Sequence, residues 1–437
     1  MRSLSGPRTE LIDCRGATVL PGLIDPHLHL FALAARDAHL DCAHFTRVAD
    51  LLAAVRARAS EPGEWVRGEQ LDEATLDRLP TASELDAAAP RNPVRLRHRS
   101  RHASVLSGRA LRLLGVSDRH GVVAGLEPAI GRVVGPLAPA ALAAGFARAA
   151  RELAAVGLTT VADATPRTWS SLAPLRRVMR DESFPLRVHA MRRLGGGSWP
   201  SHGRLYASAV KLMVEEGPDG LVPGPAVLAR WIARAAAEGA QVAVHCVGSA
   251  TLVAALAGFA ALPASQRRGR RHRLEHVAEC PPPLVSRIAA TGLTVVTNPS
   301  FVGLRGDVYR RETVRSAQPW LYRARTLVAA GVPMAAASDA PVAPPSPWMG
   351  IAAARTRRTP SGHVLGARER VGAAEAVGLY TRGAAYALRA DAFGRLTAGG
   401  PADLIVVTPD PFVASADETR ETAVALTMVA GKVVWRT

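Results

Sequence analysis

The stretch RAAAEGAQVAVHCVG (residues 234–248) contains an alanine-rich helical segment, then a glycine, then a short apolar strand. The same order recurs in RELAAVGLTTVADATP (151–166), RIAATGLTVVTNPS (287–300) and TLVAAGVPMAAASDAP (326–341). Glycine ends such helices because it adopts the left-handed C-terminal conformation without strain. The strands are apolar on both faces, as buried parallel strands are. These repeated units predict an α/β fold with a parallel sheet.

Four more apolar segments bring the predicted strands to eight. They lie in TVLPGLIDPHLHL (18–30), PLRVHAM (185–191), SAVKLMVE (208–215) and HRLEHV (272–277). Eight parallel strands alternating with helices favour a TIM barrel, in which catalytic groups lie at the carboxyl ends of the strands. The rival fold is a doubly wound open sheet, but no GxGxxG motif follows the first strand. In chain order the strands end near His29, Asp163, Met191, Lys211, His245, His276, Thr297 and Asp339.

The chain is strongly basic, with a formal net charge of +17. Basic clusters occur in RLRHRSRH (95–102) and QRRGRRHR (266–273). A basic surface can attract nucleic acid. However, no aromatic residues interleave with these clusters and no nucleic-acid-binding motif is present. We therefore expect solvated arginines and no nucleic-acid partner.

Targeting signals are absent from the sequence pattern. No uninterrupted apolar run reaches ~18 residues, so we expect no membrane association. The first residues, MRSLSGPRTELIDCRG, lack the apolar segment of a signal peptide. The cysteines form no CxxC pair and are interpreted as reduced thiols, which predicts a cytoplasmic location. A homo-oligomer is compatible with the sequence, which gives no further indication of oligomeric state. The cysteines are Cys14, Cys42, Cys246 and Cys280.

Six potential metal ligands fall on five predicted strand ends. His27 and His29 are two residues apart and so share one face of a strand. Each ligand alone has an ordinary explanation: a structural histidine, an ion-pairing lysine, or an aspartate that closes a turn or caps a helix. Their coincidence at the strand ends of one barrel favours a metal site. The six are His27, His29, Lys211, His245, His276 and Asp339.

Lys211 is one of only two lysines in a chain with 54 lysine and arginine residues, the other being Lys432. A neutral lysine amine can add carbon dioxide to form a carbamate, a two-oxygen anion. Arginine cannot, because its guanidinium stays protonated. The apolar context AVKLM (209–213) favours loss of the lysine proton. We interpret Lys211 as a carboxylated lysine that bridges two metal ions.

Several motifs resemble those of the amidohydrolase superfamily: LPGLIDPHLHL, AVKLM, VAVHCVG, HRLEHV and ASDAPV. ASDAPVAPPSPWMGIAAARTRR (337–358) and the closing GGPADLIVV and VAGKVVW are similar to its N-substituted formamide deformylase-like, or YtcJ-like, branch. The resemblance covers nearly the whole chain. It implies a distorted TIM barrel beside a small β-sandwich and metal-dependent hydrolysis of carbon–nitrogen bonds.

The resemblance also implies roles for the ligands. His27 and His29 would bind the first metal, and His245 and His276 the second. Carboxylated Lys211 would bridge the two ions. Asp339 would bind the first metal and act as the catalytic base.

The implied domains are a sandwich from residues 1–20 and 386–437 and a barrel over 21–385, with an insertion at about 31–145. Without the insertion, the barrel has the usual size of about 250 residues. Related proteins have several strands before the HxH strand, whereas here only residues 1–20 precede it. We therefore expect either a curtailed sandwich or a start farther upstream.

Three residues are candidate substrate contacts. The branch has a GHSAxVNS-like motif that faces substrate, which reads RHASVLSG (101–108) here. His102 matches its histidine, while Ser107 replaces its asparagine. Asp163 and Asn298, at the ends of the second and seventh strands, are further candidates, although Asp163 could instead close a turn.

The predicted activity is cleavage of an amide, N-substituted formamide or cyclic amide in a small-molecule substrate. Two divalent ions, with zinc the expected metal, would hold a hydroxide for attack, and Asp339 would move the protons. A mononuclear deaminase or lyase-like relative is the first alternative, although a single metal needs no bridging Lys211. The second is a non-catalytic basic binding protein, against which the six intact ligand positions argue.

Overall fold

The computed structural model describes residues 6–7, 9–59, 61–99, 103–117, 120–217 and 219–437. The chain forms two compact units. One comprises Met1–Leu30 and Arg148–Thr437, and the other comprises Phe31–Ala147. Within the described ranges, no helix is long and apolar enough to cross a membrane.

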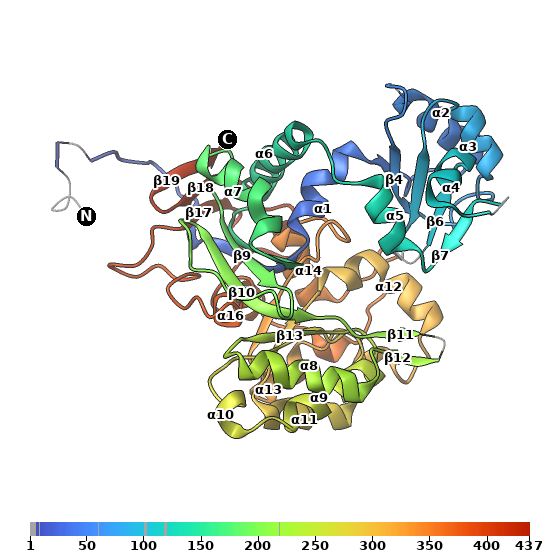
Figure 1. The fold of residues 1–437 in the computed structure, drawn as a ribbon. Coiled ribbons are helices and arrows are strands. Elements are labelled where there is room, and N and C mark those ends of the chain that lie inside the picture. The colour runs from blue at the N-terminus through green and yellow to red at the C-terminus, as the bar shows by residue number, and fades with distance from the viewer. Residues whose placement is uncertain (1–5, 8, 60, 100–102, 118–119, 218) are drawn as a thin grey trace. The chain divides into compact units, whose positions relative to one another are not determined.

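The first unit contains an eight-stranded parallel sheet that curves into a nearly closed TIM barrel, which confirms the predicted fold (Figure 1). The predicted helix-ending glycines have positive φ angles, for example 85° at Gly157 and 67° at Gly292. In chain order the barrel strands are β2 (Leu23–Leu28), β8 (Leu158–Arg167), β9 (Arg187–Arg192), β10 (Leu205–Leu212), β13 (Val242–Cys246), β14 (Arg273–His276), β15 (Thr294–Thr297) and β16 (Met334–Ala336).

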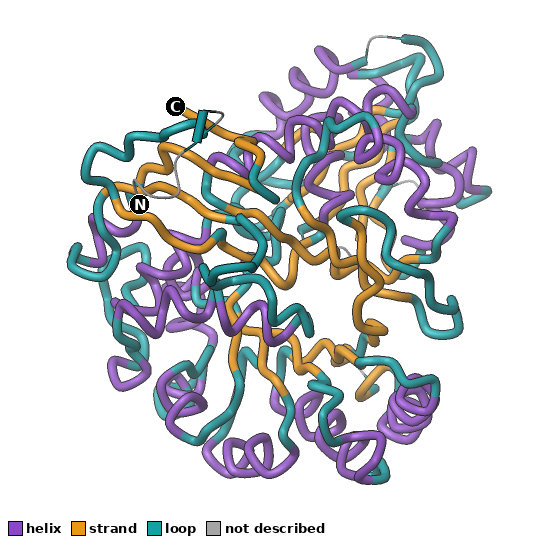
Figure 2. The backbone as a smooth tube through the Cα atoms, turned by 90° about the vertical axis from the view of Figure 1, so that its left-hand side faces the viewer, coloured by secondary structure: helices purple, strands orange, loops and turns teal. Residues whose placement is uncertain are grey.

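Helices lie on the outer side of the barrel strands (Figure 2). Their apolar faces pack on the sheet; Leu228 and Ile232 of α8 are fully buried. The helices of this unit are α6 (Pro139–Ala155, shared with the second unit), α7 (Ala173–Arg180), α8 (Pro225–Ala237), α9 (Ser249–Ala260), α10 (Ala264–Arg267), α11 (Pro282–Thr291), α12 (Ser300–Glu312), α13 (Arg325–Ala329), α14 (Pro347–Thr356), α15 (Ala373–Leu379), α16 (Arg382–Ala387) and α17 (Ala416–Arg420).

The barrel is closed at its carboxyl end by hydrogen bonds between β2 and the residues that follow β16. Asp339 N donates to His27 O at 2.9 Å, and His29 N donates to Ala340 O at 2.7 Å. Beside them, the buried Asp25 carboxyl group accepts a hydrogen bond from Ser338 Oγ at 2.5 Å. These contacts bring Asp339 to the HxH strand.

The two chain ends form one antiparallel sheet of four strands, in the order β1, β17, β18, β19. Only one strand precedes the barrel in the described part of the chain, so the expected sandwich consists there of a single sheet. Short β11 (Glu215–Gly217) and β12 (Gly220–Val222) form a separate hairpin. The four strands are β1 (Thr18–Pro21), β17 (Leu404–Thr408), β18 (Ala423–Val429) and β19 (Lys432–Arg436).

The second unit has its own five-stranded sheet, in the order β3, β4, β5, β6, β7, and its own apolar core. A capping box at Thr81 and Glu84 begins α3. The elements are α1 (Leu30–Ala35), β3 (Leu40–Asp41), α2 (Val48–Arg58), β4 (Val66–Leu71), α3 (Ala82–Ala88), β5 (Val94–His98), β6 (Ala103–Leu106), α4 (Gly108–Leu114), β7 (Val122–Ala124) and α5 (Glu127–Val134).

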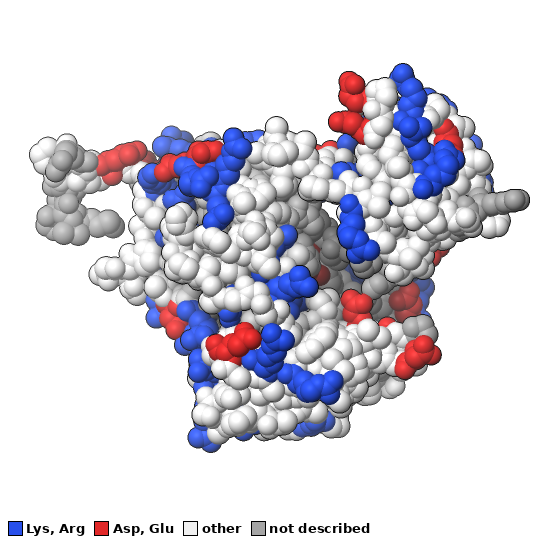
Figure 3. All heavy atoms as spheres, viewed as in Figure 1, with Lys and Arg blue, Asp and Glu red and all other residues white. Residues whose placement is uncertain are grey.

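Basic side chains are spread over the visible surface rather than gathered in one patch. On the face shown in Figure 3, lysine and arginine side chains occupy several separate places among uncharged residues, and acidic side chains lie beside some of them. This distribution is that of solvated surface arginines.

An ion pair joins the barrel to the four-stranded sheet. Arg187 of β9 and Asp403, just before β17, are both buried, and Arg187 donates to the two oxygens of Asp403 at 2.8 and 3.0 Å. Breaking a buried pair leaves an uncompensated charge, which is strongly destabilising.

We therefore expect Asp403→Asn to lower the free energy of unfolding by about 3–5 kcal/mol. Urea denaturation followed by tryptophan fluorescence would measure the loss. The control is Glu182→Gln, which breaks the exposed pair between Glu182 and Lys432 and should cost less than about 1 kcal/mol. Equal effects of the two variants would contradict this assignment.

Candidate metal centre

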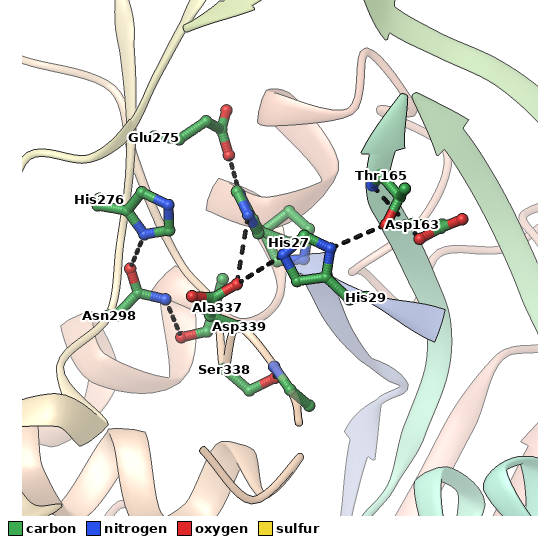
Figure 4. A network of polar contacts seen from close by, with 12 residues as sticks. His27, His29, Asp163, Thr165, Glu275, His276, Asn298, Ala337, Ser338 and Asp339 are labelled. Atoms are coloured by element: carbon green, nitrogen blue, oxygen red, sulfur yellow. Dashed lines mark hydrogen bonds and ion pairs between the residues drawn. The ribbon is translucent and has the colours of Figure 1, made fainter. Parts of the chain in front are cut away.

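Three of the six predicted ligands converge at the closure of the barrel. His27 and His29 come from the end of β2, and Asp339 follows β16 (Figure 4). Asp339 Oδ1 lies 3.5 Å from His27 Nε2 and 3.3 Å from His29 Nε2. One potential ligand atom from each of the three residues lies within 4.8 Å of the others. Two imidazole nitrogens and a carboxylate oxygen form a donor set that suits zinc and similar divalent ions.

The other three predicted ligands surround this group. The His276 ring lies 4.7 Å, between ring centroids, from the rings of both His27 and His245. Lys211 of β10 is buried, and its Nζ has no hydrogen-bond partner among the described residues. The register of three adjacent parallel strands explains this grouping. Lys211 of β10 lies opposite Ala243 of β13, and Cys246 of β13, the residue after His245, lies opposite His276 of β14.

Burial keeps His27, His245 and His276 neutral. It lowers the pKa of His27 to about 3, helped by the charge of Lys211 and opposed by Glu275. The pKa values of His245 and His276 are also lowered, first by burial and then by neighbouring positive charges. Neutral imidazole is the form that binds a metal ion.

The two ionisable groups of opposite sign, Asp339 and Lys211, also have shifted pKa values. Burial alone would raise the pKa of Asp339, but the hydrogen bond from His29 and the nearby histidines hold it below the ordinary range. Burial lowers the pKa of Lys211, against the attraction of Glu275 and Asp339. Asp339 is therefore a carboxylate, and the amine of Lys211 loses its proton more readily than an exposed lysine does.

A carboxylate outside the predicted set orients His27. Glu275 of β14 accepts a hydrogen bond from Nδ1 of His27, which leaves Nε2 free to bind an ion (Figure 4). Arg273 in turn holds Glu275 through two hydrogen bonds of 2.7 and 2.9 Å and donates to Pro26 O at 2.8 Å. Carboxylate groups that receive the second ring N–H of a histidine ligand are a common feature of metal sites.

Asn298 orients a second histidine. Its Nδ2 donates to Ala337 O at 3.1 Å, so its Oδ1 faces His276 Nδ1 at 2.8 Å and must accept from it. His276 Nε2 is thereby left free to bind an ion. Asn298 is buried, and both of its side-chain groups bind the protein, so a contact with substrate stays a prediction.

Asp163 supports the turn after the HxH motif. Its Oδ1 accepts from Leu30 N at 3.2 Å, and its Oδ2 accepts from Arg167 Nε at 2.8 Å. His29 Nδ1 lies 2.9 Å from Thr165 Oγ1, two residues further along β8. These contacts fix the start of α1, and a role of Asp163 toward substrate likewise stays a prediction. His102 lies outside the described residues.

Two of the six predicted ligands have strained backbones. His276 and Asp339 adopt φ angles of 70° and 61°, the left-handed region that non-glycine residues seldom occupy. Such strain persists where surrounding contacts impose it, and it is concentrated at functional sites. Here it occurs where the chain leaves the barrel wall, and it sets the direction of both side chains.

Sequence reasoning missed Glu275, Arg273, Asp25 and Thr165. Glu275 and Arg273 both lie in the HRLEHV motif, and their signal was the presence of two charges in a predicted buried strand of the barrel. Charged residues are almost never fully buried unless paired. Asp25 had the same signal in LPGLIDPHLHL, whereas nothing marked Thr165.

A TIM barrel whose strand ends gather such side chains has the architecture of a barrel enzyme. The family model described as amidohydrolase family matches residues 10–435, and the chain therefore belongs to this family of hydrolases acting on carbon–nitrogen bonds.

Among curated relatives, an N-substituted formamide deformylase from Arthrobacter pascens is 28% identical, with 99% of this chain and 91% of the relative covered. The putative amidohydrolase YtcJ from Bacillus subtilis is 25% identical, with 98% and 91% covered. Among solved structures, an uncharacterized metal-dependent hydrolase from Pyrococcus horikoshii has a TM-score of 0.79 at 23% identity, over 94% of this chain and 90% of that one.

Glu275→Gln tests the orienting role of this carboxylate. Outer-shell substitutions of this kind typically weaken metal affinity by about 10–100-fold, and we expect a loss in that range. Competition with a chromophoric chelator would measure the affinity, and circular dichroism would confirm folding. Glu279→Gln, in the segment after β14, is the control. An unchanged affinity in the folded Glu275→Gln protein would exclude the role.

Proposed function

We propose that the chain is a metal-dependent hydrolase that cleaves the carbon–nitrogen bond of an amide, an N-substituted formamide or a cyclic amide, with two divalent ions. The observation that carries the proposal is the convergence of His27, His29 and Asp339. The neighbouring rings of His245 and His276 support it.

The donor set divides into two groups. His27, His29 and Asp339 would hold the first ion, and His245 and His276 the second. Zinc is the metal we expect, because nitrogen and carboxylate ligands suit it, although other divalent ions accept the same set.

Lys211 would bridge the two ions as a carbamate. Its Nζ is buried without a hydrogen-bond partner among the described residues, which is a costly state for an ammonium group. Addition of carbon dioxide to the neutral amine replaces a buried cation with an anion that can bind both ions. The lowered pKa of Lys211 favours the neutral amine that this addition requires.

When bound, the ions lower the pKa of water and polarise the scissile carbonyl group. Asp339 accepts the proton of the attacking water and delivers it to the leaving nitrogen. Its depressed pKa and its position beside both histidines keep it ionised for the first transfer. Glu275 and Asn298 keep His27 and His276 in the tautomer with Nε2 unprotonated.

The relatives favour a small amide as substrate. The 28% identical protein from Arthrobacter pascens is named for N-substituted formamides, and we propose this class as the first to be screened. His102 stays a candidate substrate contact in this proposal, on the sequence motif alone.

A mononuclear enzyme, such as a deaminase, is the second candidate. Among the described residues at the barrel end, only His27, His29 and Asp339 approach closely enough to form one ligand group. That observation is compatible with a single ion. The number of ions per chain therefore decides between the two candidates.

The binuclear proposal predicts two metal ions per chain in protein purified with bicarbonate. In Lys211→Arg we expect one ion or none, because arginine cannot form the carbamate. Elemental analysis would count the ions, and Lys432→Arg is the matched control at the other lysine. One ion in both wild type and Lys211→Arg would favour the mononuclear enzyme, and none in either folded protein would exclude metal catalysis.

Asp339→Asn should retain much of the metal but lose about 10²–10⁴-fold in kcat, the usual contribution of general acid–base catalysis. Turnover of N-formyl amines and amides, measured with metal content, would test this. A rate within about threefold of wild type would remove Asp339 as the proton carrier.

A further inference from the structure

A polar cleft of about 370 Å³ lies beside β9 and β10, apart from the candidate metal centre. None of the six candidate metal ligands lines it. The connection between these adjacent strands, residues 193–204, contains no helix (Figure 1). The outer surface of the barrel is therefore left without the usual covering helix at this place. Ser198 and Ser201 of this connection line the cleft.

The cleft is cationic. Arg192 and Arg389 line it, and no aspartate or glutamate does. Hydroxyl groups complete the lining: Tyr206 and Ser208 come from β10, in addition to the two serines of the connection. A site with positive charge and several hydroxyl donors suits an anion with oxygen acceptors.

Arg192 differs from the other buried arginines of the described chain. Arg187, Arg273 and Arg323 each pair with a carboxylate. Arg357 instead donates to three backbone carbonyl groups, one from each guanidinium nitrogen. Each of these four guanidinium groups therefore has either a carboxylate partner or an acceptor for every nitrogen.

Arg192 is only 8% exposed, but among the described residues its guanidinium has neither a carboxylate partner nor an acceptor for every nitrogen. Nε donates to Ser208 O at 2.9 Å, and Nη1 donates to Gly197 O at 3.3 Å. It forms no ion pair with any described carboxylate. Glu238 attracts its charge electrostatically but lies beyond ion-pair distance. A buried charge without a partner is unfavourable, and an anion in the cleft would supply the missing partner.

Two neighbouring polar atoms are also unsatisfied. Ser208 Oγ and His189 Nε2 have no hydrogen-bond partner among the described residues. His189 stacks on Tyr206, with ring centroids 4.7 Å apart. A hydroxyl group that rotates toward a bound anion would gain the partner that Ser208 lacks.

We propose that this cleft binds a small oxyanion, a phosphate or a carboxylate, through the guanidinium of Arg192 and the surrounding hydroxyl groups. The two sources share one chemistry, a negatively charged group with several oxygen acceptors. The proposal is independent of the activity at the metal centre.

Isothermal titration with inorganic phosphate, and separately with acetate, at constant ionic strength would test it. We expect millimolar or tighter binding to wild type, and a loss of about tenfold to a hundredfold in Arg192→Met, since hydrogen bonds to charged groups are the strong ones. Arg230→Met, which removes an exposed arginine of α8, should bind as wild type and controls for net charge. The anion that binds with the higher affinity would show whether the cleft prefers a phosphate or a carboxylate.

Phosphate that binds at the metal centre would be insensitive to Arg192→Met. Binding unchanged in that variant, or no binding at about 10 mM, would therefore overturn the proposal. If Arg192→Met does not fold, Arg192→Lys keeps a cation but loses the planar fork. Wild-type affinity in the folded Arg192→Lys protein would overturn it equally.

Discussion

The closure of the barrel is the constraint on which the site depends. Hydrogen bonds between Asp339 N and His27 O, and between His29 N and Ala340 O, hold the first and last barrel strands together. They also place a carboxylate against two imidazole groups. The left-handed backbone at Asp339 is tolerated because Asp25 and Ser338 fix the preceding residues. The same hydrogen bonds thus close the barrel and bring His27, His29 and Asp339 together.

Charged side chains buried inside the barrel compensate one another. Arg273 and Glu275 form a buried ion pair beside His27, and this pair makes the presence of two charges in β14 tolerable. The carboxylate serves two partners, since it compensates Arg273 and orients His27. Lys211 Nζ, in contrast, is a charged atom of this region that the described residues leave without a hydrogen-bond partner.

The barrel could be predicted because its pattern is local. Each helix-ending glycine, such as Gly292, and each apolar strand is visible within about 15 residues of sequence, and parallel strands in register bring their ends together. Contacts such as Glu275 with His27 join residues far apart in the chain, and a single sequence carries no sign of them. The sandwich, expected to be curtailed or to start farther upstream, stays a prediction; in the described part of the chain the two ends form one four-stranded sheet.

The order of the ligands along the chain has a consequence for biosynthesis. His27 and His29 emerge first from the ribosome, but the residue that completes their group, Asp339, follows only after the second unit and seven further barrel strands. Because loop closure precedes such long-range contacts, a nascent chain presents two histidines without their carboxylate for most of its synthesis. In the proposed function, the first ion would therefore find its complete ligand group only in the finished barrel, and its binding would require that the whole chain has folded.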